Sequence, residues 1–249
     1  MSKFLVFQVH GPMQAWGDIA VGEIRPVADH PGRSGVAGLL AAALGLTRDG
    51  SDAEGYLRLA GALRIAVRAD APGTPLHDYH TTQTPGKTTR TCFGTRRDEL
   101  AHEHQNLIET FRHYVQDAAF TICATFAERL KWSLDQLAEA IRRPRFALYL
   151  GRKACPPSLP LAPRTGDFKT IEQALAEYPA FDGIRQRLAR RNRDTPTVWW
   201  DVGLPTRIKA LGELTRRDVP ESRAGQFRFR RRIERYGKMP GRSEVNDVP

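Results

Sequence analysis

Cysteine is scarce in this chain, and the positions of the few cysteines argue against stabilisation by disulfides or by a structural zinc ion. Only three cysteines occur among 249 residues, at Cys92, Cys123 and Cys155. Their number is odd and no two lie close in sequence, so the chain has neither a disulfide framework nor the paired spacing of a zinc site. A reducing compartment is therefore expected, and Cys155 is expected to be a small packed residue rather than a reactive thiol.

Long apolar runs are also missing. The N-terminal run at 4–9 is too short for the core of a signal peptide, and no later segment has the roughly 20 apolar residues needed to span a bilayer. We therefore expect a cytoplasmic protein without a membrane partner. The sequence also shows no internal repeat and no heptad pattern.

Acidic residues are outnumbered. The chain has 28 Asp and Glu against 38 Lys and Arg, which gives a net charge of +10 and a pI near 9.9. Such an excess favours polyanionic partners, because each phosphate contact releases condensed counterions. Nucleic acid is the first candidate and an anionic membrane the second; the alternative is a basic surface that only contacts water.

The apolar pattern predicts an α+β protein. Strands are expected at 3–10, 63–70, 118–126 and 145–150, and helices at 34–46, 56–63 and 133–142, with helical spacing also at 107–116. Ser34 and Ser133 are expected to be helix N-caps, and 63–70 alternates as a half-buried strand does. Strand-helix-strand-strand-helix-strand is the order of the ferredoxin-like fold, which RNA-recognition domains share.

This order suggests three parts. Residues 1–155 are predicted to form the ferredoxin-like domain, with an insertion at about 77–116; residues 156–236 a basic C-terminal region with a short helix at 171–178 and strands at 198–202 and 227–233; and residues 237–249 a loose tail. Within the insertion, 78–103 has few apolar residues, so an exposed hairpin, an extended loop and partial disorder all stay open.

Three loops carry candidate ligand-binding residues. After the first strand, Gln14 has an amide suited to a base and Trp16 a ring that either stacks on a base or closes the core. Arg33 and Ser34 begin a helix, where free N–H groups attract phosphate; an ordinary helix cap is the alternative. The third group is Tyr149, Gly151, Arg152 and Lys153, a basic turn suited to phosphate or only to water.

Four motifs resemble one family when they are taken in order. They are GPMQAWG at 11–17, RSG at 33–35 before an apolar helix, DYHT at 78–81, and YLGRK-x-CP at 149–156. Together they are similar to the CasD family, a subunit of the type I-E CRISPR surveillance complex called Cascade. The segments 82–105 and 185–193 depart from the family pattern.

The resemblance implies a ferredoxin-like body with a thumb inserted before the third strand. It implies binding to the 5′ handle of the CRISPR RNA and contact with the backbone subunits and with the large subunit, which examines target DNA. Arg112 matches an arginine near the thumb base, where handle and guide meet. The thumb candidates are His80, Thr81, Lys87, Arg90, Arg96 and Arg97.

Two rival functions remain open. One is a metal-independent ribonuclease, which needs a base and a cation; His80 with Lys87 or Arg112 has the right residue types. The other is a structural RNA-binding domain of a different particle. A metal site at His102 and His104 is not expected, because residues at i and i+2 do not share a helix face. We predict no catalytic residue, no metal and no cofactor.

Overall fold

The structure is a computed structural model that describes the chain except residues 49, 87–91, 179–194, 224–225, 242–244 and 246–249. Its main sheet contains β1 (Ser2–His10), β4 (Leu63–Ala71), β7 (Ala119–Phe126), β8 (Arg164–Phe168), β9 (Thr197–Asp201), β10 (Gly212–Arg223) and β11 (Gln226–Lys238). The order is β10-β11-β9-β4-β7-β1-β8, and all neighbours are antiparallel. The described helices are α1 (Arg33–Leu44), η1 (Gly50–Asp52), α2 (Ala53–Ala62), α3 (Arg96–Leu100), α4 (Leu134–Arg142) and α5 (Ile171–Glu177). The predicted α+β class is confirmed.

Both faces of this sheet are covered where β1 lies. Along β1, Leu5, Phe7 and Val9 belong to a core shared with α1, α2 and α4. Phe4 and Val6 point to the opposite face, where they pack in a second core with α5 and β9. The alternation of side chains in a strand explains this division, and it places the helices in two separate layers on the sheet.

The prediction of a half-buried β4 was wrong for its second face. Arg68, expected on a solvent-exposed face, is only 3% exposed. Its guanidinium donates hydrogen bonds to Asp70 (2.6 Å), to Thr121 (3.2 Å) and to the backbone carbonyl of Leu175 (2.5 Å). The alternating pattern could not reveal that α5, far along the chain, covers this face.

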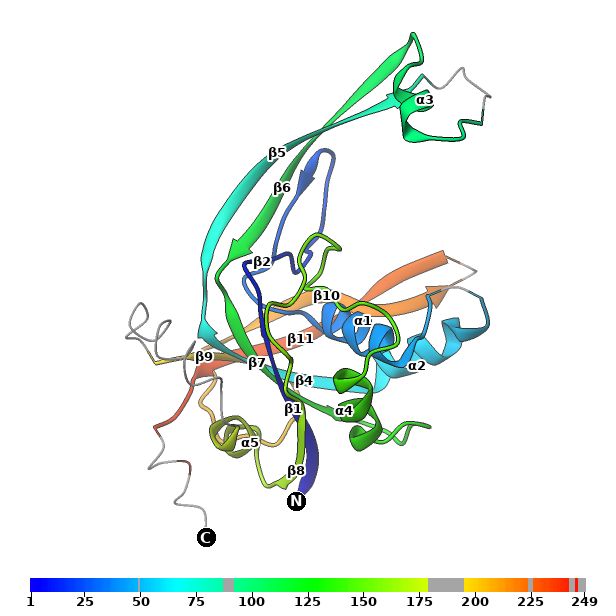
Figure 1. The fold of residues 1–249 in the computed structure, drawn as a ribbon. Coiled ribbons are helices and arrows are strands. Elements are labelled where there is room, and N and C mark those ends of the chain that lie inside the picture. Colours follow the sequence, from blue (N-terminus) through cyan, green and yellow to red (C-terminus); the bar gives the residue numbers. More distant parts are fainter. Residues whose placement is uncertain (49, 87–91, 179–194, 224–225, 242–244, 246–249) are drawn as a thin grey trace.

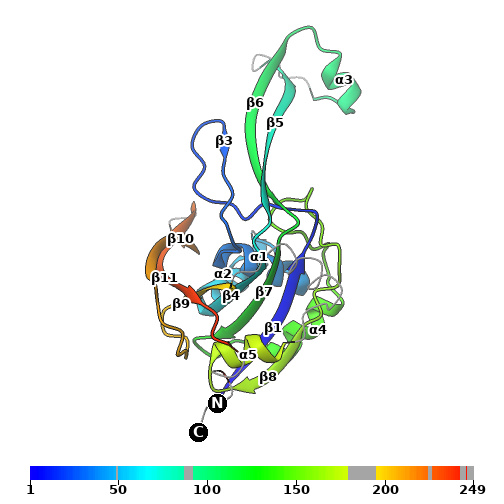
Figure 2. The ribbon, with the colours of Figure 1, turned by 90° about the vertical axis from the view of Figure 1, so that its left-hand side faces the viewer.

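A second, smaller sheet carries a long hairpin. It contains β2 (Met13–Gln14), β3 (Ile24–Arg25), β5 (Thr74–Pro85) and β6 (Gln105–Gln116). β5 and β6 pair antiparallel over their whole length and rise away from the main sheet, with α3 near the far end (Figure 1 and Figure 2). Of the alternatives for 78–103, the hairpin is confirmed for the described residues.

The helical spacing predicted at 107–116 was wrong, because these residues form β6. Leu107, Ile108 and Phe111 are 57%, 49% and 45% exposed. They form no helical core stripe, and the strand is held by its ladder with β5.

The strand predicted at 145–150 was also wrong. This segment is irregular, and its backbone amides serve a helix end instead of a sheet. Arg145 and Phe146 donate N–H bonds to the carbonyls of Ala43 and Ala42, which belong to the last turn of α1. Such terminal carbonyls have no partner inside their own helix. The strand that follows α4 in the sheet is β8, at 164–168.

The two predicted N-caps had different outcomes. Ser133 caps α4 with a complete capping box formed with Gln136, as predicted. For α1 the prediction was wrong: Gly32 is the N-cap, and Ser34 lies inside the first turn. Gly45 ends α1 in the left-handed conformation, with φ of 79°.

Four strands of the main sheet come from residues beyond 155. β9, β11 and α5 confirm predicted elements, while β8 and β10 were not predicted. β11 continues to Lys238, inside the segment predicted as a tail, and Met239 is buried. The arginine run at 185–193 lies outside the described residues. No helix of the described residues is long and apolar enough to cross a membrane.

Candidate nucleic-acid interface

Two of the predicted loops meet at one end of the sheet. The N–H of Ala15 donates a 2.9 Å hydrogen bond to the carbonyl of Leu150. Gly151 has a φ of +94°, and a Cβ there would lie 1.9 Å from the carbonyl oxygen of Ala15. Only glycine fits this close approach, so Gly151 joins the 11–17 loop to the 149–153 loop.

Gln14 and Trp16 are held inside the protein. The Gln14 side chain donates to the carbonyl of Ala118 (2.6 Å) and accepts from the indole N–H of Trp16 (2.8 Å). Both side chains are at most 2% exposed, and Trp16 packs in the main core against Gly35. Trp16 thus closes the core, which was the alternative to stacking on a base. A Gln14 contact with RNA stays a prediction.

A carboxylate lies where a phosphate was predicted. Asp218 of β10 accepts a 2.7 Å hydrogen bond from the N–H of Arg33 in the first turn of α1. The Arg33 guanidinium is buried and lies 2.7 Å from Asp201 of β9. The free N–H groups and positive dipole of a helix N-terminus attract either kind of anion. Here the anion comes from the chain itself.

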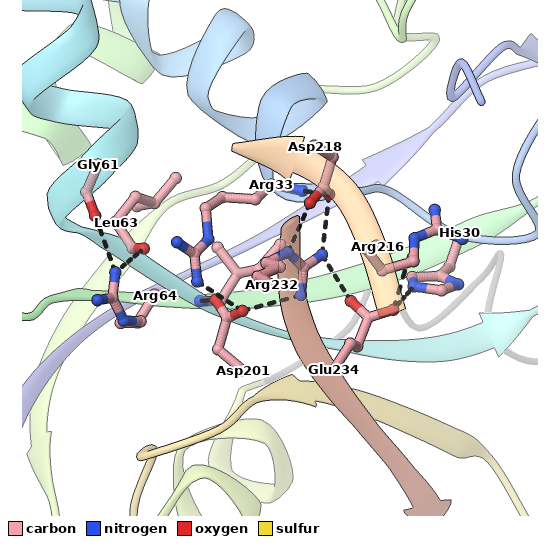
Figure 3. A network of polar contacts seen from close by, with 11 residues as sticks. His30, Arg33, Gly61, Leu63, Arg64, Asp201, Arg216, Asp218, Arg232 and Glu234 are labelled. Carbon is pink, nitrogen blue, oxygen red and sulfur yellow. Dashed lines mark hydrogen bonds and ion pairs between the residues drawn. The ribbon is translucent and has the colours of Figure 1, made fainter. Parts of the chain in front are cut away.

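Arg232 lies at the centre of this buried ion network (Figure 3). Its guanidinium donates hydrogen bonds of 2.7 and 2.9 Å to Asp218, 2.8 Å to Asp201 and 2.7 Å to Glu234. Burial opposes its charge, but these carboxylates outweigh burial and raise the pKa of Arg232 above its usual range. The network ties the start of α1 to β9, β10 and β11.

His30 extends the network. Its two ring nitrogens lie 2.7 Å from Asp29 and 2.9 Å from Glu234, and the ring stacks on Trp199. Burial alone would lower the pKa of His30, but the hydrogen bonds to the two carboxylates outweigh it and raise that pKa. The same histidine lowers the pKa of Glu234 against the opposing effect of burial.

A cavity of about 490 Å³ lies beside these loops, and we call it the loop cavity. Its lining includes four predicted residues, Trp16, Ser34, Gly151 and Arg152. The sequence did not indicate the other cations of the lining, Arg48, Arg216 and Arg217. The loop cavity thus has four arginines against two acids, Asp18 and Asp218, and Asp218 is already paired with Arg232.

A family model described as CRISPR-associated protein (Cas_Cas5) matches residues 4–240. The chain belongs to the Cas5 family. The chain is 33% identical over 191 residues, 74% of its length, to the CRISPR system Cascade subunit CasD of Escherichia coli (strain K12), of which it covers 80%. The similarity to CasD that the four motifs predicted is therefore confirmed.

Solved structures agree with this family assignment. A chain of a structure titled CRISPR RNA-guided surveillance complex is 29% identical with a TM-score of 0.63, over 96% of this chain and 90% of that one. A structure titled Crystal structure of Cas protein is 26% identical with a TM-score of 0.55, over 95% of each chain.

Arg152 connects three parts of this Cas5-family chain. Its guanidinium donates 3.1 Å hydrogen bonds to the carbonyls of His113 in β6 and Arg25 in β3, and it lies over the ring of Tyr114. It therefore fastens the base of the hairpin to the loop cavity. Tyr149 and Lys153, the other predicted members of this turn, are exposed.

The predicted thumb residues are spread along the hairpin. Arg112 pairs with Asp78 in the β5–β6 register and donates to Thr110. His80 is half-buried, with its ring 3.7 Å from Asp78. Thr81, Arg96 and Arg97 are exposed, and Arg96 pairs with Glu99 in α3. Lys87 and Arg90 lie outside the described residues. The described thumb residues do not reach the loop cavity lining.

Sequence reasoning missed Arg48, Arg216, Arg217 and Arg232. Arg217 belongs to β10, a strand that was not predicted, so its position at the loop cavity had no signal. Arg232 lies in the run 228–232, whose charge indicates a solvent-exposed face, although this arginine is only 7% exposed. The one available signal was the spacing of Arg232 and Glu234, which places a base and an acid two residues apart and therefore on the same face of a strand.

Proposed function

We propose that this Cas5-family chain is a subunit of a Cascade-type CRISPR surveillance complex, and that it holds the 5′ handle of the CRISPR RNA without cutting it. The observation that carries the proposal is the loop cavity, where a family-typical loop, a helix start and a basic turn adjoin four arginines. Two of the similar proteins bear names that tie them to such complexes.

The charges of the loop cavity support a backbone ligand. Among the described residues, Arg217 has no carboxylate within ion-pair distance, and its Nε donates to the carbonyl of Phe229 at 3.2 Å. Its remaining donors are free for phosphate oxygens, which guanidinium groups bind in pairs. Gln14 and Trp16 then act by shaping the loop, because their polar groups are bonded within the protein.

The strand order supports the finer fold assignment. β4-β7-β1-β8 is an antiparallel arrangement in which α1 and α2 connect β1 to β4, and α4 connects β7 to β8. The ferredoxin-like arrangement consists of two strand-helix-strand units whose strands interleave in one antiparallel sheet. We therefore propose a ferredoxin-like body extended by β9, β10 and β11.

The hairpin supports contact with neighbouring subunits. Tyr79, Leu107, Ile108 and Phe111 are 45–57% exposed on β5 and β6. Exposed apolar side chains that gather on a projecting element are typical of protein interfaces. We propose that this hairpin is the thumb that separates handle from guide, that it contacts the backbone subunits, and that target DNA is reached only through the large subunit.

Binding to a fluorescent handle RNA tests the first part of the proposal. The full chain should bind the handle more tightly than a scrambled RNA of equal length. Each phosphate contact that is lost lowers the salt slope by about 0.7 for a single strand, so Arg48→Gln/Arg217→Gln should lower it by about 1.4. The control Arg129→Gln/Arg143→Gln removes the same charge outside this cavity. Equal slopes for the two variants would refute the assignment.

Cleavage assays separate binding from catalysis. Incubation of the full chain with labelled repeat RNA in EDTA should leave the RNA intact. Specific cleavage that disappears in His80→Ala would establish the rival ribonuclease. Purification from cells should yield a multi-subunit complex with a small guide RNA, whereas an RNA-free monomer would contradict the proposal.

A further inference from the structure

The two-stranded ribbon formed by β10 and β11 has a second basic cavity, distinct from the loop cavity. We call it the ribbon cavity; its volume is about 430 Å³, within the range of ligand pockets, roughly 300–1,000 Å³. Six arginines but only two acids line it: Arg33, Arg64, Arg230, Arg231, Arg232 and Arg235, with Asp201 and Glu213.

The two acids of the ribbon cavity are already neutralised. Asp201 lies 2.7 Å from Arg33 and 2.8 Å from Arg232, and it also accepts a backbone N–H bond from Ile65. Glu213 lies 2.6 Å from Arg235. Three arginines of the lining, namely Arg64, Arg230 and Arg231, form no ion pair with any carboxylate among the described residues.

Arg64 is held in place for an anion. One terminal nitrogen of its guanidinium donates 2.9 Å bonds to the carbonyls of Gly61 and Leu63, as Figure 3 shows. The other donors stay available, and a guanidinium that is already ordered loses little entropy on binding. Burial lowers the pKa of Arg64, and the nearby cations Arg33 and Arg230 act in the same direction, against Asp201 and Glu128. A bound anion would favour the charged form of this guanidinium.

The ribbon also places like charges directly opposite each other. Arg217 of β10 pairs with Arg231 of β11 in the register, and like charges in such positions are destabilising. The neighbouring pair, Arg216 with Arg232, is compensated by Glu234. No carboxylate of the described residues compensates Arg217 with Arg231. These two residues line the loop cavity and the ribbon cavity respectively.

We propose that the ribbon cavity is a second nucleic-acid site, which takes the phosphodiester backbone of a strand through Arg64, Arg230 and Arg231. A repeated phosphate suits the arrangement because the uncompensated arginines continue from one cavity to the other across the ribbon. A single small anion would neutralise only one end of this row, and an acidic protein segment is the rival macromolecule.

The test uses the full chain and labelled probes of sequence unrelated to the handle: single-stranded RNA, single-stranded DNA and duplex DNA. Arg230→Gln/Arg231→Gln alters two exposed side chains without carboxylate partners, so folding is preserved. The salt slope should fall by about 1.4 for a single strand or about 1.8 for the duplex, equivalent to roughly 25- to 60-fold weaker binding at 0.1 M salt. The probe that the unaltered chain binds most tightly identifies the natural strand.

The control and the remaining outcomes decide the proposal. Arg129→Gln/Arg143→Gln removes equal charge elsewhere and should lower the slope much less; equal losses would overturn the proposal. The proposal would also be overturned if inorganic phosphate stabilised the protein while no nucleic-acid probe bound. It would likewise be overturned if a Glu-rich peptide bound more tightly than every probe. Failure of the handle experiment leaves this test intact, because each cavity has its own variants.

Discussion

Removal of the central cation should severely destabilise the protein. Arg232→Met keeps an unbranched side chain but removes a charge that is hydrogen-bonded to three carboxylates at 2.7–2.9 Å. Breaking a buried ion pair by deleting one partner costs about 3–5 kcal/mol, because the other charge stays buried without compensation. In a protein of this size each kcal/mol lowers Tm by about 2–4 °C, so a fall of roughly 6–20 °C is expected.

The matched control lies on the same strand. Arg235→Met breaks the pair with Glu213, whose side chains are 44% and 50% exposed, and exposed pairs contribute only about 0–1 kcal/mol. Urea and thermal unfolding followed by tryptophan fluorescence compare the two variants. If both lose the same stability, or if Arg232→Met melts like the wild type, the ion network does not hold the ribbon and the reasoning is refuted.

Three further predictions address the loops and the histidine. Gly151→Ala should lower the free energy of unfolding by at least about 1 kcal/mol more than Gly203→Ala does. Both glycines have φ near +95°, but only at Gly151 would a Cβ clash with a backbone oxygen. Equal melting temperatures of the two variants would argue against this prediction. The protonated form of His30 stabilises the fold fully below its ordinary pKa of 6.5, and this contribution is lost as pH rises through the raised folded-state pKa. The difference in unfolding free energy between wild type and His30→Gln should therefore be largest near about pH 6 and shrink at higher pH, and a gap that is constant with pH would contradict this. Gln14→Leu leaves the Trp16 indole N–H without its acceptor and should cost about 1–3 kcal/mol, measured by urea unfolding; wild-type stability would show that this bond is dispensable.

Much of the sheet could be predicted from the sequence because burial follows strand alternation. β1, β7 and the inner face of β4 have apolar residues at every position that the core requires. The segment 145–150 has similar apolar character, but its amides bond to the end of α1. The pattern of apolar side chains predicts which residues are buried, but it does not show which carbonyl groups the backbone amides will reach. The strand was therefore predicted where the chain instead bonds to a helix end.

The ligand-binding loops were found from the sequence, but their electrostatics were not. The residues near Arg33 in the sequence do not show whether the N–H groups of this helix start are free to bind a phosphate or already bond to a carboxylate of the chain. The deciding residue, Asp218, lies 185 positions away on a strand that was not predicted. Long-range pairing of this kind also separates Arg232, which is buried among acids, from Arg230 and Arg231, which are exposed.

The late position of β9, β10 and β11 in the chain has a consequence for synthesis on the ribosome. β4 and α1 emerge early, yet β9 completes one side of β4, and Asp218 supplies the anion for α1. A nascent chain that stops before residue 197 has an open strand edge, which invites pairing with other chains. It also has a guanidinium at Arg33 with no counterion. Interrupted copies should therefore aggregate or be degraded rather than accumulate as partly working subunits.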